Sequence, residues 1–231
     1  MYRSGSELAR LILGNKLGSA EDPLRSEDPL LLSGASDGAD TVFGAAALAA
    51  GHRAAHLLGP TNEPSVRAVE DFAVYRVDEG ALDDPRVVCA LESAAAARRE
   101  APEAWEASKR NYLQVCRAAA VYAVGYRQPG DVPALDVGGG AGFAAQFYVD
   151  RFLDGDGCRL FFFDDSPTDG WAGCKVVPAT HGRWNAWDVD REAWTPLARP
   201  PPRPSGVYAG IGATRLSRDG EAAIEALFNT G

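Results

Sequence analysis

The chain has 231 residues, which corresponds to one decorated domain at roughly 150 residues per domain. Asp and Glu number 32 against 23 Lys and Arg, and the net charge of -9 argues against an extended phosphate-binding surface for long nucleic acid. The longest uncharged apolar stretches, such as 43–51, are too short to cross a bilayer, and no charged-then-apolar leader opens the chain. We therefore expect a soluble, cytoplasmic protein that has no membrane partner.

The four cysteines are spaced too widely for a zinc or redox motif. Cys89, Cys116, Cys158 and Cys174 contain no C-x-x-C pair, so we expect reduced thiols, most of which have a packing role. His52 and His56 would share the face of a helix and could then bind a metal together, but they follow Gly51, which ends a helix, and lie in an expected strand. The sequence therefore predicts no metal site and no bound cofactor.

The first quarter of the chain predicts alternating helices and strands. Residues 6–17 have the apolar spacing of a helix, and 30–33 form a short apolar run typical of a buried strand. The glycine-rich segment 34–40 leads into an alanine-rich helix over 41–50. Gly51 ends that helix, and 52–58 supplies the next strand. Two strands joined by a helical crossover are expected to be parallel.

Residues 61–117 are expected to form a helical excursion that covers one face of the sheet. Helical spacing occurs in three pieces of this region, which are 65–75, 83–97 and 102–117. Pro85 and Pro102 punctuate them.

The alternation of strands and helices resumes after residue 119. Residues 120–125 and 158–163 are predicted strands, and the second ends in Asp164 and Asp165. Between them, the run 135–137 leads into a second glycine-rich segment over 138–142. An amphipathic helix is expected to follow over 143–153.

The last quarter holds a tryptophan-rich segment and a third glycine-rich segment. Residues 171–198 are expected to form a lid or a small hairpin outside the core sheet. A proline-rich spacer over 199–204 precedes a strand at 207–209, which runs into the glycines of 210–215. A helix over 218–228 closes the chain, so residues 1–231 are expected to form one α/β domain.

A glycine-rich turn between a strand and a helix can bind a phosphate without a lysine. Backbone N–H groups point outward at the positive end of the helix, and glycine allows the ligand to approach closely. In a parallel α/β sheet the carboxyl ends of the strands share one edge, so three such turns are expected to converge on a crevice.

None of the three turns matches a standard nucleotide signature. No Lys follows a glycine turn as a P-loop requires, and residues 138–142 read G-G-G-A-G instead of G-x-G-x-x-G. An ordinary dehydrogenase or a P-loop ATPase is therefore not expected.

The glycine segments carry a family resemblance. L-L-S-G-A-S-D-G-A-D at 31–40 resembles the S-G-G-A-x-G-A-D turn of the SLOG superfamily, which includes the DprA/SMF and LOG (lysine-decarboxylase-like) proteins. D-V-G-G-G-A-G-F-A-A-Q at 136–146 looks like the second glycine turn of that superfamily. Y-A-G-I-G-A-T-R at 208–215 looks like its Y-A-G-I-G-S-R strand end.

The order of these segments differs from the family pattern. In that family the G-I-G strand opens the domain, whereas here it comes last. The resemblance implies a circular permutation, or else a second, unrelated strand in that place. It implies a Rossmann-like, doubly wound, mainly parallel sheet with helices on both faces.

The resemblance implies a site for a nucleotide-derived ligand on the three turns. The implied ligand-binding residues are Gly34, Ala35, Ser36, Asp37, Gly38, Asp40, Gly138, Gly139, Gly140, Gly142, Gln146, Gly210, Gly212, Thr214 and Arg215.

Several of these residues also have a purely structural interpretation. Asp40 is equally suited to capping its helix, and Arg215 to pairing with a surface carboxylate. Trp184 and Trp187 either stack a base or pack their own segment.

Two functions remain open, and a third is disfavoured. The first is binding of a nucleotide or nucleotide derivative, as a sensor or carrier. The second is hydrolysis of a nucleotide N-glycosidic or phosphoester bond, as in LOG-like phosphoribohydrolases. Gln146 stands near the place of the LOG-type glutamate and cannot shuttle a proton, so this reading uses Asp136, Asp164 or Asp165.

The remaining expectations concern partners. Binding of single-stranded DNA conflicts with the net charge of -9, and the two basic pairs at 98–99 and 109–110 are expected to be solvated helix faces. Because related proteins self-associate through helical faces, a homodimer is a further expectation.

Overall fold

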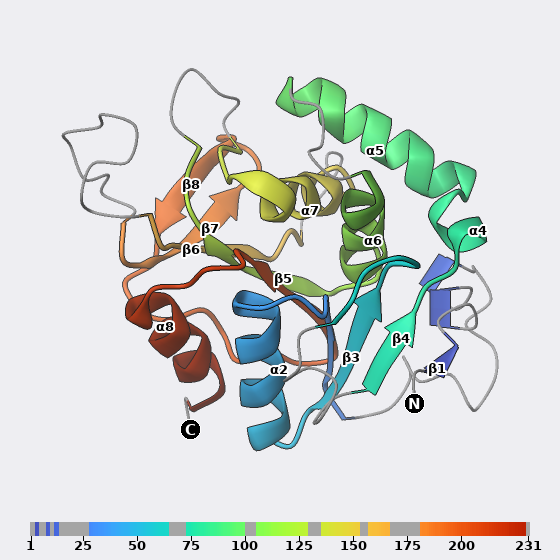
Figure 1. The fold of residues 1–231 in the computed structure, drawn as a ribbon. Helices are drawn as coiled ribbons and strands as arrows, with labels where there is room; N and C mark the ends of the chain where they lie inside the picture. Colours follow the sequence, from blue (N-terminus) through green and yellow to red (C-terminus); the bar gives the residue numbers. More distant parts are fainter. Residues whose placement is uncertain are drawn as a thin grey trace.

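The computed structural model describes residues 3–4, 8–9, 12–13, 28–64, 73–99, 105–128, 135–152, 157–166 and 181–229. Within these residues nine strands form one sheet in the order β1-β4-β3-β2-β9-β5-β6-β7-β8 (Figure 1). The strands are β1 (Arg3–Ser4), β2 (Leu30–Ser33), β3 (Arg53–Leu58), β4 (Ala73–Arg76), β5 (Ala120–Gly125), β6 (Leu160–Asp164), β7 (Trp184–Asp188), β8 (Ala193–Pro196) and β9 (Val207–Gly212).

Six helices with complete bounds accompany this sheet in the described part of the chain. They are α2 (Ala39–Ala49), α4 (Glu79–Leu82), α5 (Pro85–Arg98), α6 (Trp105–Val115), α7 (Gly139–Val149) and α8 (Arg218–Asn229). None of the helices among these residues is long and apolar enough to span a membrane.

The sheet is mostly parallel. All pairings from β1 to β6 are parallel, whereas β7 and β8 are added antiparallel at one edge. In the middle of the sheet, Leu31 of β2 is in register with Ala54 of β3 on one side and with Tyr208 of β9 on the other. The protein is therefore α/β with a mixed, mainly parallel sheet, as expected, and this arrangement is consistent with a Rossmann-like fold.

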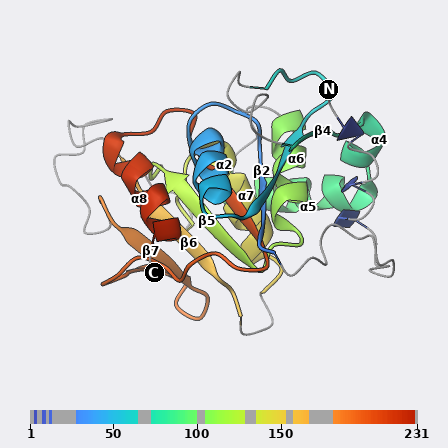
Figure 2. The ribbon, with the colours of Figure 1, turned by 90° about the horizontal axis from the view of Figure 1, so that it is seen from below.

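Alternating side chains of the strands divide the apolar core between the two faces of the sheet. Leu31 and Tyr122 pack on the face that α2 and α8 cover, whereas Val121 and Phe162 pack on the face that α7 covers. Figures 1 and 2 show α2 and α8 side by side. Both faces of the sheet are thus buried, which explains why β5 and β6 are continuous apolar runs.

The last strand of the chain lies in the middle of the sheet. β9 pairs with β2 on one side and with β5 on the other. Glycine allows α2 to pack closely on β9, because a Cβ on Gly210 would lie 2.6 Å from the Phe43 ring and one on Gly212 would lie 2.6 Å from Ala39 Cβ. These two glycines therefore have a packing role.

The helical excursion expected over 61–117 contains a strand. The predicted helix over 65–75 is wrong at its end, because β4 pairs in parallel with β3 and with β1; residues 65–72 lie outside the described residues. Val74 and Tyr75 are strand formers, and the hydrogen bonds of neighbouring strands override a weak helical spacing. The other two helices are confirmed with shifted ends, as α5 and α6.

The second glycine segment does not follow a strand of the sheet. Residue Val137 makes only an isolated antiparallel bridge with Arg127, so the expectation of a third strand-to-helix turn is wrong here. α7 begins at Gly139, and three of the glycines form its first turn. An amphipathic helix was expected here, but α7 is not amphipathic. It packs between α5, α6 and the sheet, and most of its side chains are buried.

The tryptophan-rich segment is a hairpin, but it belongs to the sheet. β7 pairs with β6, so the expectation that the hairpin lies outside the sheet is wrong. Its aromatic side chains cover the faces of the edge strands, with the Trp187 and Trp194 rings 5.1 Å apart. Residues 171–180 of the predicted lid lie outside the described residues.

The remaining predicted elements are confirmed where the structure describes them. β2, α2, β3, β5, β6, β9 and α8 lie at the expected positions, and Gly51 follows α2 with a positive φ of 78°. Of the helix expected over 6–17, Leu8, Ala9, Ile12 and Leu13 are helical and buried, and its other residues lie outside the described residues.

Candidate functional site

Four buried polar residues meet where β2 and β3 end. Ser33 is the last residue of β2, Asp40 lies in the first turn of α2, His56 is in β3, and Arg110 is in α6. All four are less than one-tenth exposed. They surround Gly34, and we call them the carboxyl-edge cluster because they lie where the parallel strands end.

Ser33 links β2 to both α2 and β9. Its Oγ lies 2.6 Å from Gly210 O and 3.1 Å from Asp40 Oδ1. The hydroxyl has one proton for these two acceptors. When the Asp40 carboxyl is protonated it donates to Ser33 Oγ, and Ser33 then donates to Gly210 O. While the Asp40 carboxyl is ionised, Ser33 Oγ shares its one proton between the two acceptors.

Gly34 lets side chains from the two faces of the sheet meet. A Cβ on Gly34 would lie 2.2 Å from Asp40 Oδ2 and 3.1 Å from Arg110 Nη2. The carboxyl group comes from α2 on one face, and the guanidinium comes from α6 on the other. The missing Cβ thus leaves the space in which they approach each other. Conformational freedom is not what this position requires of glycine, because Gly34 has no positive φ.

Burial dominates the electrostatics of the cluster. Burial raises the pKa of Asp40, while Arg110, His56 and the hydrogen bonds from Ser36 and Ser33 partly oppose this shift. Burial also lowers the pKa of His56, whose Nδ1 contacts Gly34 O. A neutral imidazole that donates from Nδ1 satisfies this carbonyl.

Among the described residues, Arg110 has a hydrogen-bond donor without an acceptor. It is 6% exposed, and its Nε–H has no hydrogen-bond acceptor in the part of the chain that the structure describes. Burial lowers the pKa of Arg110, and the Asp40 and Glu106 carboxylates oppose this, so the guanidinium stays charged. Glu106 itself is bonded elsewhere, since its Oε2 accepts from Thr61 Oγ1 at 2.9 Å. A buried cation with an unsatisfied donor favours an anionic ligand.

The next residue of α6 connects this cluster to the start of α7. Asn111 Nδ2 donates to Gly140 O at 3.0 Å. Gly138 is the N-cap of α7 without a side-chain cap, and the first turn has no acidic residue. The first N–H groups of a helix have no acceptor within it, so this end of α7 is electropositive. Arg110 and Asn111 thus lie between the first and second glycine segments.

The backbone N–H groups at the start of α2 have more acceptors within the protein than the sequence suggested. Ala39 N donates to Ala213 O at 3.0 Å, and Ser36 N donates to Asp40 Oδ2 at 3.3 Å. Asp40 therefore does bond the turn before its own helix. Gly38 has a φ of 83°, and the backbone of Thr214 packs against it.

The structure brings some of the expected ligand residues together and places others apart. Gly34, Asp40 and Gly140 lie around Arg110 and Asn111, whereas Ala35 packs in the core with Leu58 and Val74. Gln146 lies in the second half of α7, where its Nε2 donates to Asp150 Oδ1 at 2.7 Å. Asp37, Thr214 and Arg215 are exposed.

The second glycine segment is held by Arg98. Its guanidinium donates to Val137 O at 2.8 Å and to Leu135 O at 3.2 Å, and it lies 5.0 Å from the Phe143 ring centre. A Cβ on Gly142 would lie 2.5 Å from both terminal nitrogens of Arg98. A Cβ on Gly138 would meet the Tyr126 ring at 2.1 Å. Gly138 and Gly142 therefore permit this packing, and Gly139 has a φ of 60°.

The carboxylates of the alternative hydrolase all have protein partners. Asp136 pairs with Arg127 at 2.6 Å, and burial raises its pKa despite that partner. Asp164 Oδ1 accepts from Ser166 Oγ at 2.5 Å, and Asp165 Oδ2 accepts from Ser217 N at 2.8 Å, just before α8. All three carboxylates therefore have a structural role in these hydrogen bonds and this ion pair.

The two tryptophans that were candidates for stacking a base pack in the interior. Trp184 lies against Tyr122 and Phe163, with ring centres 6.3 and 5.6 Å away, and it is 5% exposed. Trp187 packs on Trp194. Their packing interpretation is therefore the one that the geometry supports.

Among the described residues, no three His, Cys, Asp or Glu side chains cluster as metal ligands. His52 Nδ1 lies 2.9 Å from Tyr208 Oη, away from the cluster. Cys89, Cys116 and Cys158 are free thiols, as expected, but Cys89 is exposed and does not pack in the interior. Burial raises the pKa of Cys116 to about 12, and Cys174 lies outside the described residues.

Sequence reasoning missed Ser33, His56, Arg110 and Asn111. The basic pairs at 98–99 and 109–110 were expected to be solvated, but Arg98 and Arg110 are buried. Neighbouring residues of a helix point about 100° apart. Leu113 lies three residues after Arg110 and four after Lys109, which indicates that one residue of the second pair lies on the apolar side of the helix. That signal was available from the spacing.

Comparisons with models of protein families, with curated proteins and with solved structures find no match to this chain.

Proposed function

We propose that the protein binds a small nucleotide-derived ligand through its phosphate, at the carboxyl edge of the sheet, as a sensor or carrier. One observation carries this proposal, namely the buried Arg110 guanidinium with its unsatisfied Nε–H. It lies beside Gly34 and next to the residue that contacts the start of α7. A phosphate would supply acceptors to Arg110 and to the first N–H groups of α7.

The net charge of -9 is compatible with such a ligand. A single phosphate is held by local donors, whereas a long nucleic acid needs an extended row of cations. The Asp40 and Glu106 carboxylates are the counter-charges of Arg110, and burial raises the pKa of Asp40, so protonation of Asp40 would reduce its repulsion of an incoming anion.

The fold supports the further proposal of a doubly wound sheet with a permuted order. On one side of β9 the sheet continues with β2, β3 and β4 in that order. On the other side it continues with β5 and β6. If β9 and α8 preceded β2, consecutive strands would step outward from a central strand, as in Rossmann-like sheets. Residues 197–206 would be the link that joins the former ends. This order supports the resemblance to the SLOG superfamily.

The test measures binding by isothermal titration calorimetry with AMP, ribose 5-phosphate and adenosine. The two phosphate-bearing compounds are expected to bind, and adenosine at least tenfold more weakly. Arg110→Met is expected to weaken AMP binding roughly 10- to 100-fold, since a hydrogen bond to a charged group contributes about 1.5–3 kcal/mol. Lys109→Met is the control, because it removes the same charge from the same helix. Lys109 pairs with Asp83 and not with the carboxyl-edge cluster.

A second variant separates binding from folding. Arg110→Lys keeps a cation beside Asp40 but loses the planar fork, so it is expected to fold and still to bind AMP more weakly. Equal affinity for adenosine and AMP, or wild-type affinity in both Arg110 variants, would overturn the proposal. Chromatography of the same samples for free base distinguishes binding from hydrolysis.

A further inference from the structure

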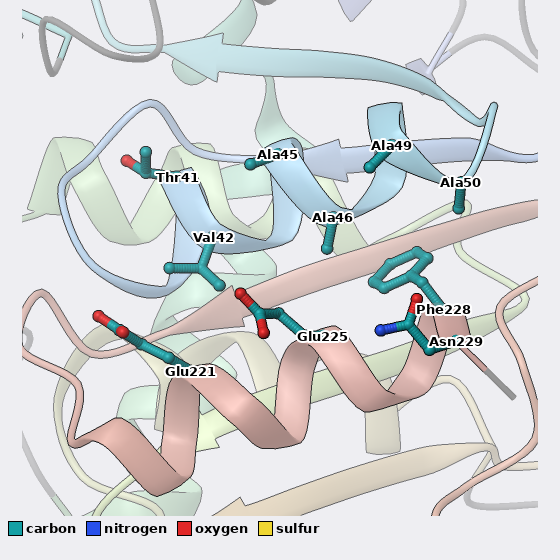
Figure 3. Close-up of a pocket in the computed structure, with 10 residues that line it drawn as sticks. All are labelled: Thr41, Val42, Ala45, Ala46, Ala49, Ala50, Glu221, Glu225, Phe228 and Asn229. Carbon is teal, nitrogen blue, oxygen red and sulfur yellow. The ribbon is translucent and has the colours of Figure 1, made fainter.

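A groove of about 720 Å³ lies between α2 and α8 on the outer surface of the protein (Figure 3). α2 contributes a stripe of small residues that includes Val42, Ala46 and Ala49. α8 contributes Glu221, Glu225 and Phe228. Both stripes repeat every three to four residues, so the groove follows the two helices along their length.

The outer side of α2 is unusual for a surface helix. Its exposed residues are Ala45, Leu48 and Ala49, and its only charged residue, Asp40, is buried in the carboxyl-edge cluster. Leu48 is 39% exposed, and among the described residues no other large apolar side chain is exposed. Surface helices normally carry polar residues on the outer side, whereas a helix that is apolar all round is normally covered. The outer side of α2 therefore has the character of an interface.

The α8 side of the groove carries negative charge. Glu221 and Glu225 are exposed and lie one helical turn apart, and Figure 3 shows the Glu225 side chain directed toward α2. The residues that line the groove include no Lys, Arg or His. In the part of the chain that the structure describes, neither glutamate forms an ion pair. The groove thus combines an uncharged side with an acidic side.

We propose that this groove binds an amphipathic helix of a partner protein. An apolar stripe of that helix would pack on the alanines of α2, and two basic side chains four residues apart would pair with Glu221 and Glu225. The 11 residues of α2 set the length of contact at about 16 Å, or three helical turns.

Charge argues against a second copy of this chain as the occupant. A two-fold dimer brings the same patch of each copy together. Such a contact would place acidic side chains from both copies around two uncharged helices, with no lysine or arginine in either groove to pair with them.

The test selects helical peptides from a displayed library against the full-length protein. The library has a fixed helical framework and random residues along one face. Enriched peptides are expected to carry Lys or Arg at two positions four residues apart beside an apolar stripe. The Kd of a synthesised winner, by fluorescence anisotropy, is expected to rise at least tenfold with Ala49→Glu. It is expected to rise about fivefold, with a weaker salt dependence, when Glu221→Gln and Glu225→Gln are combined.

The matched control is Ala222→Glu, which makes the same substitution at an exposed position of α8 outside the groove lining. Its Kd is expected to stay within twofold of the wild-type value. Three results would overturn the proposal: no enrichment of paired basic residues, equal binding to the Ala49→Glu variant, or a dimer in light scattering that Ala49→Glu dissociates. The last result would assign this face to a second copy.

Discussion

Asp40 of α2 and Arg110 of α6 approach each other from opposite faces of the sheet, across the one residue at the end of β2 that has no Cβ. A Cβ on Gly34 would lie 2.2 Å from the Asp40 carboxylate and 3.1 Å from the guanidinium. The missing Cβ of Gly34 thus leaves space that the Asp40 carboxyl group and the Arg110 guanidinium occupy.

Gly34→Ala is expected to destabilise the fold by about 1–3 kcal/mol, because the new methyl group forces Asp40 to move from its bond with Ser33. Chemical denaturation in urea measures this change. Gly80→Ala in α4 is the control, since a Cβ there meets only Asp78 at 3.6 Å. It is expected to leave stability unchanged or to raise it by up to about 1 kcal/mol. Equal effects of the two substitutions would contradict the role given to Gly34.

Asp40→Asn is expected to alter how stability depends on pH. Because burial raises the pKa of Asp40, the folded state holds this proton to higher pH than the unfolded chain does. The wild-type contribution is thus complete below the ordinary carboxyl pKa and is lost as pH rises to the raised value, by at most about 1.4 kcal/mol per unit. The variant lacks this loss, so its stability relative to wild type is expected to improve from pH 4 to pH 8.

Urea unfolding at several pH values provides that comparison. His56, whose pKa burial lowers, adds stability as pH rises toward its ordinary value, and loss of the Asp40 charge lowers its pKa further, which acts in the same direction as the loss of the Asp40 carboxyl. Leu48→Ala changes no titratable group, so its difference from wild type is expected to be constant. A constant difference for Asp40→Asn as well would show that this carboxyl does not titrate differently on folding.

Trp184→Ala is expected to cost about 3–5 kcal/mol of stability, since the indole fills the space between Tyr122 and Phe163. Binding of AMP, measured at a temperature where the variant is folded, is expected to stay within twofold of wild type. A large loss of affinity with little loss of stability would instead favour base stacking by this side chain.

Gln146→Glu restores the residue type that LOG-like enzymes have near this position. It is expected to release no free base from AMP, because Gln146 faces Asp150 in the second half of α7. Like charges four residues apart are expected to reduce stability by about 0.2–0.5 kcal/mol. Liquid chromatography and urea unfolding check the two outcomes, and base release by the variant would reopen the enzymatic reading.

The sequence predicted most of the regular elements because their apolar patterns are local. The runs at 30–33, 120–125 and 158–163 are buried strands, and the alanine-rich segment after residue 38 is a helix. The pattern failed at β4, where a four-residue strand is defined by its neighbours in the sheet. It also failed at β7, whose pairing with β6 depends on contacts across the sheet.

The sequence by itself determined an acidic α/β chain with glycines at the turns and at the start of α7. Composition gives the charge, and the spacing of apolar residues within a few positions gives the helices and strands. Only the tertiary structure decided that β9 lies between β2 and β5, and that α6 places Arg110 beside Asp40. Whether a cation faces solvent or a buried carboxyl depends on which helix packs over which strand. No local pattern encodes that choice, because Asp40 and Arg110 are 70 positions apart in the sequence.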